Sequence, residues 1–189
     1  MSNTVFIFHG TEGYPEENWF PWMKDELEKR HCSVFVPQLP SPPIIPAKIS
    51  EWFDVLETYK AHLSSQTIII GHSLGGKFLL RLLEKLEQPI RASCFIATPI
   101  GIPPIANNER DNAFTGNDFD WPVIRRNAGR CMVYQSDNDP YVGIENGREL
   151  ARHLGVGLSF IQGAGHFNTK AGYTKFENLR DKIVAMLNG

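Results

Sequence analysis

The sequence predicts an α/β fold: a doubly wound, mostly parallel six-stranded sheet with helices on both faces. Six short apolar runs recur along the 189 residues, and each is almost continuously apolar, as strands buried on both faces of a parallel sheet are. Stretches with the period of an amphipathic helix separate the runs. Strict alternation of strands and helices is the pattern of a doubly wound sheet.

The expected strands and helices follow one another without an internal repeat or a domain linker. The strands are expected at residues 5–8, 34–36, 67–70, 93–97, 131–135 and 158–161. The helices are expected around residues 19–27, 49–63, 79–86, 150–154 and 176–186. In the third helix the leucines share one face, and Lys77, Arg81 and Lys85 are expected to face away from it.

Two connections interrupt this alternation. Residues 37–46 contain five prolines, which predict a stiff, extended segment. Residues 98–122 form a connection longer than loops usually are. Both follow the carboxyl ends of strands, where ligands bind in open α/β sheets. They are expected to be pocket walls or a small lid, with ordinary surface loops as the alternative.

Composition is that of an ordinary globular protein and predicts one domain over residues 1–189. The chain is 42% hydrophobic and 21% charged, and its net charge of −2 gives no reason to expect nucleic acid or an anionic membrane as a partner. No stretch has the length to span a bilayer, and the first residues lack the features of a signal peptide. Cys32, Cys94 and Cys131 show no metal-binding spacing and predict buried thiols in a reducing compartment, so the expected location is cytoplasmic.

The pentapeptide Gly71-His72-Ser73-Leu74-Gly75 carries the main chemical signal. A serine flanked by glycines between a strand and a helix is typical of a strained turn that exposes a nucleophilic hydroxyl. Glycine is required where strand and helix backbones come too close for a β-carbon. Ser73 is therefore the expected nucleophile.

A serine nucleophile needs a base, normally a histidine held in one tautomer by a carboxylate. His166 lies in a glycine-rich segment after the last expected strand, where the base of such a fold belongs. His9 and His72 are expected to pack or to orient loops at strand ends. The other three histidines lie at helix ends and are expected to be solvated: His31, His62 and His153.

The expected acid follows the strand at residues 131–135, where Asp137 and Asp139 are both present. Asp139 precedes Pro140 and stands three residues before Val142, a spacing common after this strand. Asp139 is favoured, and Asp137 remains an alternative with a turn-forming or capping role as its other explanation. The carboxylates of Asp118 and Asp120 in the long connection are expected to be solvated.

The oxyanion that forms during acyl transfer needs preorganised N–H donors. One is expected to be the backbone amide of Leu74, at the positive end of its helix. The second is expected in the turn after the first strand, from Thr11 or from Glu12. A plain glycine turn is the alternative for this segment.

These motifs together resemble the α/β-hydrolase superfamily over nearly the whole chain. The matching segments are His9-Gly10, Gly71-His72-Ser73-Leu74-Gly75-Gly76, Asp139-Pro140 and Gly165-His166-Phe167. The size and the start directly at the strand before the oxyanion turn resemble the small serine hydrolases related to retinoblastoma-binding protein 9. The resemblance implies a reduced α/β-hydrolase fold with a Ser-Asp-His triad. The segment Thr11-Glu12-Gly13 departs from the usual glycine-rich turn, and an inward Glu12 carboxylate would oppose the oxyanion.

The sequence thus predicts a serine hydrolase, an esterase that acts on small carboxylic esters or related acyl compounds through an acyl-enzyme. It implies a small-molecule acyl substrate and neither a metal nor an organic cofactor, and it does not indicate an oligomeric state. A thioesterase, peptidase or acyltransferase would use the same triad. A binding or regulatory protein that keeps the scaffold with little turnover is the alternative from another class.

Overall fold

Six parallel strands form the centre of the molecule, in the order β2-β1-β3-β4-β5-β6. The computed structural model describes residues 3–41, 48–106 and 108–188. The strands are β1 (Thr4–Phe8), β2 (Ser33–Phe35), β3 (Thr67–His72), β4 (Ala92–Ile96), β5 (Arg130–Gln135) and β6 (Leu158–Phe160). Every residue of β1, β3 and β4 is buried, as their continuous apolar composition predicts. Each strand overlaps the run expected from the sequence, so the six-stranded parallel sheet is confirmed.

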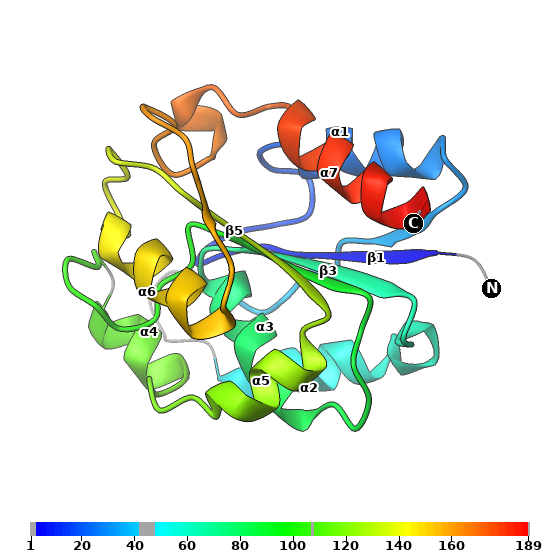
Figure 1. Cartoon of the computed structure of the whole chain (residues 1–189), viewed down its shortest axis with the longest axis horizontal. Helices are drawn as coiled ribbons and strands as arrows, with labels where there is room; N and C mark the ends of the chain where they lie inside the picture. Colours follow the sequence, from blue (N-terminus) through cyan, green and yellow to red (C-terminus); the bar gives the residue numbers. More distant parts are fainter. Residues whose placement is uncertain (1–2, 42–47, 107, 189) are drawn as a thin grey trace.

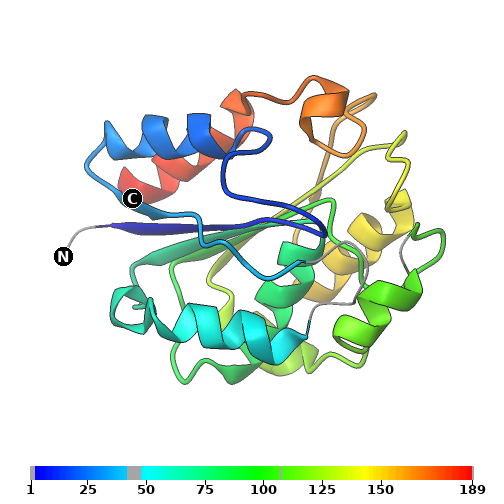
Figure 2. The same cartoon turned by 180° about the vertical axis from the view of Figure 1, so that it is seen from behind.

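Helices cover both faces of the sheet, as the doubly wound pattern predicts (Figure 1). On one face lie α1 (Phe20–Glu28) and α7 (Glu177–Asn188), which pack beside each other. On the other lie α2 (Ile49–Glu57), α3 (Leu74–Lys85), α4 (Asn108–Phe114), α5 (Trp121–Asn127) and α6 (Ile144–Leu154). Figure 2, the view from behind, shows the same two layers. Each layer buries its own apolar cluster against the sheet.

The structure corrects two sequence expectations about helices. The helix expected at residues 49–63 ends at Glu57, and a separate 3₁₀ turn covers Lys60–His62. The connection at residues 98–122 contains α4 and the start of α5. Asp120 caps α5, accepting a hydrogen bond from the Val123 amide at 3.1 Å, so this carboxylate has a structural partner. Pro122 in the first turn suits the same helix start.

The long connection also covers part of the polar face of α3, at Lys77 and Arg81, whereas Lys85 on the same face is exposed. Lys77 is 1% exposed and donates a hydrogen bond to Asn112 of α4 at 3.3 Å. Arg81 donates to the carbonyls of Gly116 and Asp118, both at 2.9 Å. These bonds fasten the connection to α3. This attachment argues against a movable lid.

The proline-rich connection is described only up to Ser41, and residues 42–47, with three of its prolines, lie outside the described residues. The three cysteines are free thiols; Cys32 and Cys94 are buried, but Cys131 is only partly buried. Among the described helices, none has the length and apolar character to cross a membrane.

The sheet register brings the loops of distant segments together. Phe8 pairs with Gly71, His72 with Ile96, and Ile96 with Tyr134, so the carboxyl ends of four strands lie side by side. The segments after β1, β3, β5 and β6 therefore meet at one edge. That edge holds the expected site.

Candidate functional site

Ser73 occupies the sharp turn between β3 and α3. Its backbone has φ 54° and ψ −122°, a conformation that a residue with a side chain rarely adopts. Its amide donates a hydrogen bond to the Ile96 carbonyl of the neighbouring strand at 2.8 Å, which fixes the turn. A β-carbon at Gly75 would lie 2.3 Å from the Phe8 carbonyl oxygen, so a glycine is required there. The turn has the geometry that the sequence pattern predicts.

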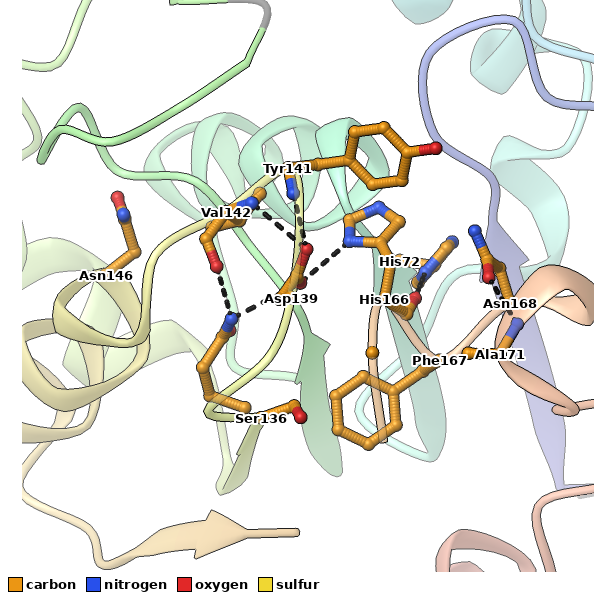
Figure 3. A network of polar contacts seen from close by, with 12 residues as sticks. His72, Ser136, Asp139, Tyr141, Val142, Asn146, His166, Phe167, Asn168 and Ala171 are labelled. Carbon is orange, nitrogen blue, oxygen red and sulfur yellow. Dashed lines mark hydrogen bonds and ion pairs between the residues drawn. The ribbon is translucent and has the colours of Figure 1, made fainter. Parts of the chain in front are cut away.

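His166 and Asp139 lie in hydrogen-bond contact at this edge of the sheet. Nδ1 of His166 donates to Oδ2 of Asp139 at 2.8 Å (Figure 3). The Asp139 side chain is fully buried, and its other oxygen accepts from the amides of Tyr141 and Val142 at 2.8 and 3.1 Å. The hydrogen bond from the Val142 amide explains the spacing between aspartate and valine that singled out Asp139. This arrangement leaves Nε2 of His166 as the ring nitrogen available for proton transfer.

Asp137 has a different place, although the sequence left it as an alternative acid. It is exposed and accepts a hydrogen bond from the Gly163 amide at 2.8 Å, and this bond lowers the pKa of the carboxyl. Asn138 accepts similarly from the Gly165 amide at 2.7 Å. Both side chains brace the loop that carries His166. The geometry therefore brings Asp139, and not Asp137, to the imidazole.

Two buried rings hold the backbone around His166. Nε2 of His72 donates to the His166 carbonyl at 2.8 Å, and Nε1 of Trp19 donates to the Phe167 carbonyl at 3.0 Å. Figure 3 shows the His72 ring beside this loop. Burial lowers the pKa of His72 to about 3, so its ring is neutral near pH 7. His72 thus orients a loop, as the sequence favoured.

The turn after β1 lies directly against the serine. A β-carbon at Gly10 would lie 2.8 Å from Cβ of Ser73, which shows how closely the two turns approach. The Glu12 side chain is exposed, and the Glu12 amide donates to the Ser41 hydroxyl at 2.6 Å. His9 is buried behind this turn. Its Nε2 accepts a hydrogen bond from the Leu39 amide at 2.9 Å, and its Nδ1 donates one to the Gly10 carbonyl. His9 therefore joins loops, as expected.

A cleft of about 790 Å³ opens over these residues. Ser73 and His166 both line it, so the expected nucleophile and base share one accessible space. The segment after β1 lines it with residues 10–12, 14 and 16–18, and two later segments line it with residues 141–142 and with residues 168–170 and 174. From the long connection only Ile105 reaches the cleft among the described lining residues. Among the described residues, the long connection therefore forms only a small part of the cleft wall.

Two polar residues at the site were not found from the sequence. Gln135, at the end of β5, donates to Oδ2 of Asp139 at 3.4 Å and to the Val142 carbonyl at 2.8 Å. The only indication in the sequence was that a polar residue, Gln135, ends an apolar strand. Glu17 lines the cleft, and burial raises the pKa of its carboxyl to about 7. Nothing in the sequence pattern distinguished Glu17 from its exposed neighbours.

The described residues offer no group of three or more His, Cys, Asp or Glu side chains placed to hold a metal ion. The arrangement combines a serine hydroxyl and an imidazole that line one cleft with a buried carboxylate bonded to the imidazole.

The chain is similar to known hydrolases over most of its length. The hydrolase named YdeN from Bacillus subtilis strain 168 is 26% identical over 185 residues, which cover 98% of this chain and 96% of that protein. The serine hydrolase RBBP9 from Rattus norvegicus is 27% identical over 172 residues, covering 89% of this chain and 86% of the relative.

Solved structures show the same fold. The crystal structure of YdeN matches with a TM-score of 0.90 at 25% identity, over 100% of both chains. Est1E from Butyrivibrio proteoclasticus matches with a TM-score of 0.75 at 13% identity, over 100% of this chain and 89% of that one. The model of the serine hydrolase family matches residues 5–185, so the chain belongs to the serine hydrolases.

Proposed function

We propose that the protein hydrolyses small carboxylic esters or related acyl compounds through an acyl-enzyme on Ser73. The observation that carries this proposal is the hydrogen bond of 2.8 Å between His166 and the buried Asp139, at the cleft that Ser73 also lines. Membership of the serine hydrolase family supports the hydrolytic chemistry.

In this proposal the Ser73 hydroxyl attacks the acyl carbon while Nε2 of His166 accepts its proton. Asp139 holds the imidazole in the required tautomer and stabilises the imidazolium that forms. His166 then gives the proton to the leaving alkoxide, and water attacks the acyl-enzyme with His166 again as base. Four hydrogen bonds to the Asp139 carboxylate, from His166, Gln135, Tyr141 and Val142, support its positioning role.

The oxyanion is proposed to bind the amides of Leu74 and Thr11. Leu74 begins α3, where the helix dipole favours negative charge. The Glu12 amide already donates to Ser41, which supports Thr11 over Glu12 as the second donor. The exposed position of the Glu12 side chain reduces the electrostatic conflict that its carboxylate would create. The free thiols support a reducing compartment such as the cytoplasm as the place of action.

The proposal is tested by covalent labelling and by steady-state kinetics. A fluorophosphonate is expected to modify Ser73 in the folded protein, and p-nitrophenyl acetate is expected to be hydrolysed. The Ser73→Ala variant is expected to lose both reactions. Absence of an adduct on Ser73 in wild-type protein overturns the proposal and favours a binding protein on this scaffold.

The two aspartates provide a matched pair for the acid. Asp139→Asn is expected to lower kcat by about 10³- to 10⁴-fold, because the amide favours the wrong tautomer of His166. Asp137→Asn makes the same chemical change two residues away, outside the contact with the imidazole, and is expected to lower kcat by less than about tenfold. Equal losses in the two variants contradict the assignment of Asp139. A parallel panel of esters, thioesters and amides then identifies the bond that is cleaved.

A further inference from the structure

The Glu17 carboxyl occupies an unusual place in the cleft wall. A β-carbon at Gly13 would lie 2.6 Å from Oε1 of Glu17, so the carboxyl lies against the turn that follows β1. The same turn approaches Ser73 through Gly10. Glu17 and Ser73 both line the cleft. A substrate bound at Ser73 therefore occupies the same cleft as this carboxyl.

Glu17 is more than half buried and has no ion pair with any cationic side chain in the described part of the chain. Burial raises its pKa to about 7, and a hydrogen bond from the Tyr14 backbone offsets only part of this effect. A partly desolvated carboxylate without a positive partner is costly for the protein. A positively charged group on a ligand would remove much of that cost.

The other ionisable groups around Glu17 do not supply this charge. His9 lies on the same side of Gly13 as Glu17, since a β-carbon at Gly13 would lie 2.8 Å from Nδ1 of His9. Burial lowers the pKa of His9, so its ring is neutral near pH 7. Burial keeps His72 neutral as well. Glu12 and Glu16 on the same segment are exposed carboxylates that also line the cleft. His166 and Lys170 also line the cleft, and no described ion pair joins either of them to Glu17.

We infer that Glu17 determines specificity by selecting acyl substrates that carry a cationic amine or ammonium group near the scissile bond. This inference rests on the proposed hydrolase function. The rings of Tyr14 and Tyr141 line the same cleft, and aromatic rings also attract ammonium groups. An anionic substrate would instead meet the repulsion of Glu17 and of the two exposed glutamates. The selected class is therefore esters of amino alcohols or of amino acids.

A pair of isosteric esters tests the inference. Acetylcholine and 3,3-dimethylbutyl acetate have nearly the same shape and differ by one positive charge. At pH 8 the wild-type ratio of kcat/KM, cationic over neutral, is expected to be about five to ten, as for a partly buried charge pair. Glu17→Gln is expected to bring the ratio close to one. Glu16→Gln removes the same charge from an exposed position and is expected to change the ratio by less than about twofold.

The pH dependence of this ratio adds a second readout. Neither ester titrates, so any change in the ratio comes from the protein. The carboxyl of Glu17 loses its proton as the pH rises through about 7, so the wild-type ratio is expected to increase between pH 6 and pH 8. The Glu17→Gln ratio is expected to remain flat over the same range.

The outcomes separate this inference from the proposed function. A wild-type ratio of one, or an unchanged ratio in Glu17→Gln, overturns the inference while labelling of Ser73 and p-nitrophenyl acetate hydrolysis leave the hydrolase function in place. A missing label on Ser73 overturns the function itself. If both isosteres turn over too slowly, choline and 3,3-dimethylbutanol are compared as competitive inhibitors of p-nitrophenyl acetate hydrolysis. Equal inhibition, or none by either, likewise overturns the inference.

Discussion

At the scale of single residues, the Glu17 carboxyl in the cleft lowers the stability of the folded protein when it ionises. Its pKa of about 7 in the folded protein lies above the ordinary value of 4.5. At a pH below that ordinary value the carboxyl is protonated in both the folded and the unfolded protein, so its ionisation does not change the free energy of unfolding. As the pH rises towards 7 the unfolded protein loses this proton more readily, so the folded state becomes less stable.

Replacing Glu17 by glutamine removes this penalty. Because the carboxyl is partly exposed, the gain in the free energy of unfolding is expected to be about 1 kcal/mol at pH 8 and close to zero at pH 4. Urea unfolding at the two pH values measures it. The same gain at both pH values would assign the effect to packing and not to ionisation.

Residue types in a fixed chain order made part of the site predictable. Ser73 was identified by its flanking glycines, and Asp139 and His166 by their places after the fifth and sixth strands. The structure places Asp139 and His166 in hydrogen-bond contact at 2.8 Å, while the catalytic roles of the three residues stay proposals. Glu17 and Gln135 were not predictable, because their significance comes from burial and from neighbours distant in the sequence.

At the scale of elements, α3 packs very closely on the strands beneath it, and its two glycines are constrained in different ways. A β-carbon at Gly75 would lie 2.3 Å from the backbone oxygen of Phe8, whereas one at Gly76 would lie 1.9 Å from the side-chain oxygen of Thr98. A substitution cannot remove the Phe8 backbone oxygen, but it can remove the Thr98 side chain.

Gly75→Ala and Gly76→Ala are therefore both expected to destabilise the protein, by about 2 kcal/mol or more, through overpacking. The further change Thr98→Gly is expected to recover part of the loss in Gly76→Ala and none of it in Gly75→Ala. Thermal unfolding of the two double variants and of Thr98→Gly alone measures the coupling. Equal recovery in both backgrounds would show that α3 shifts as a whole.

Strands were easier to predict than helices at this scale. The buried strands have a continuous apolar composition that depends little on their surroundings. The short helix α4 and the start of α5 lack a strong apolar period, and they are held by contacts such as those of Arg81 with the carbonyls of residues 116 and 118. Such contacts depend on the tertiary structure, which a local pattern does not contain. Lys77 was misplaced for the same reason, because α4 covers it.

At the scale of the whole molecule, the loop of His166 is joined to a segment almost 150 positions earlier in the chain. Trp19 is fully buried, and its ring N–H bonds the carbonyl next to His166. Trp52 is an equally buried tryptophan whose ring N–H bonds the Pro40 carbonyl, in the layer on the other face of the sheet. The two residues form a natural comparison.

Trp19→Phe and Trp52→Phe are both expected to lower the free energy of unfolding by about 1 to 3 kcal/mol, since each leaves a carbonyl unpaired, buried at Phe167 and partly buried at Pro40. Only Trp19→Phe is expected to lower kcat/KM of ester hydrolysis, by about tenfold, because the loop of the proposed base loses an anchor. Urea unfolding and p-nitrophenyl acetate kinetics measure the two effects. Parallel losses of activity in both variants would mean that the anchor acts through stability alone.

Unfavourable backbone torsions are concentrated around the cleft. Of the six non-glycine residues with positive φ, Glu12, Asn18 and Ser73 line it, Ala97 follows the strand beside Ser73, and Phe167 follows His166; His31 is the one elsewhere in the described chain. Such torsions persist only while surrounding packing enforces them. Mild warming or a low concentration of denaturant is therefore expected to disorder the loops around the cleft before the sheet unfolds. Activity is then lost while the far-ultraviolet circular dichroism spectrum is still native.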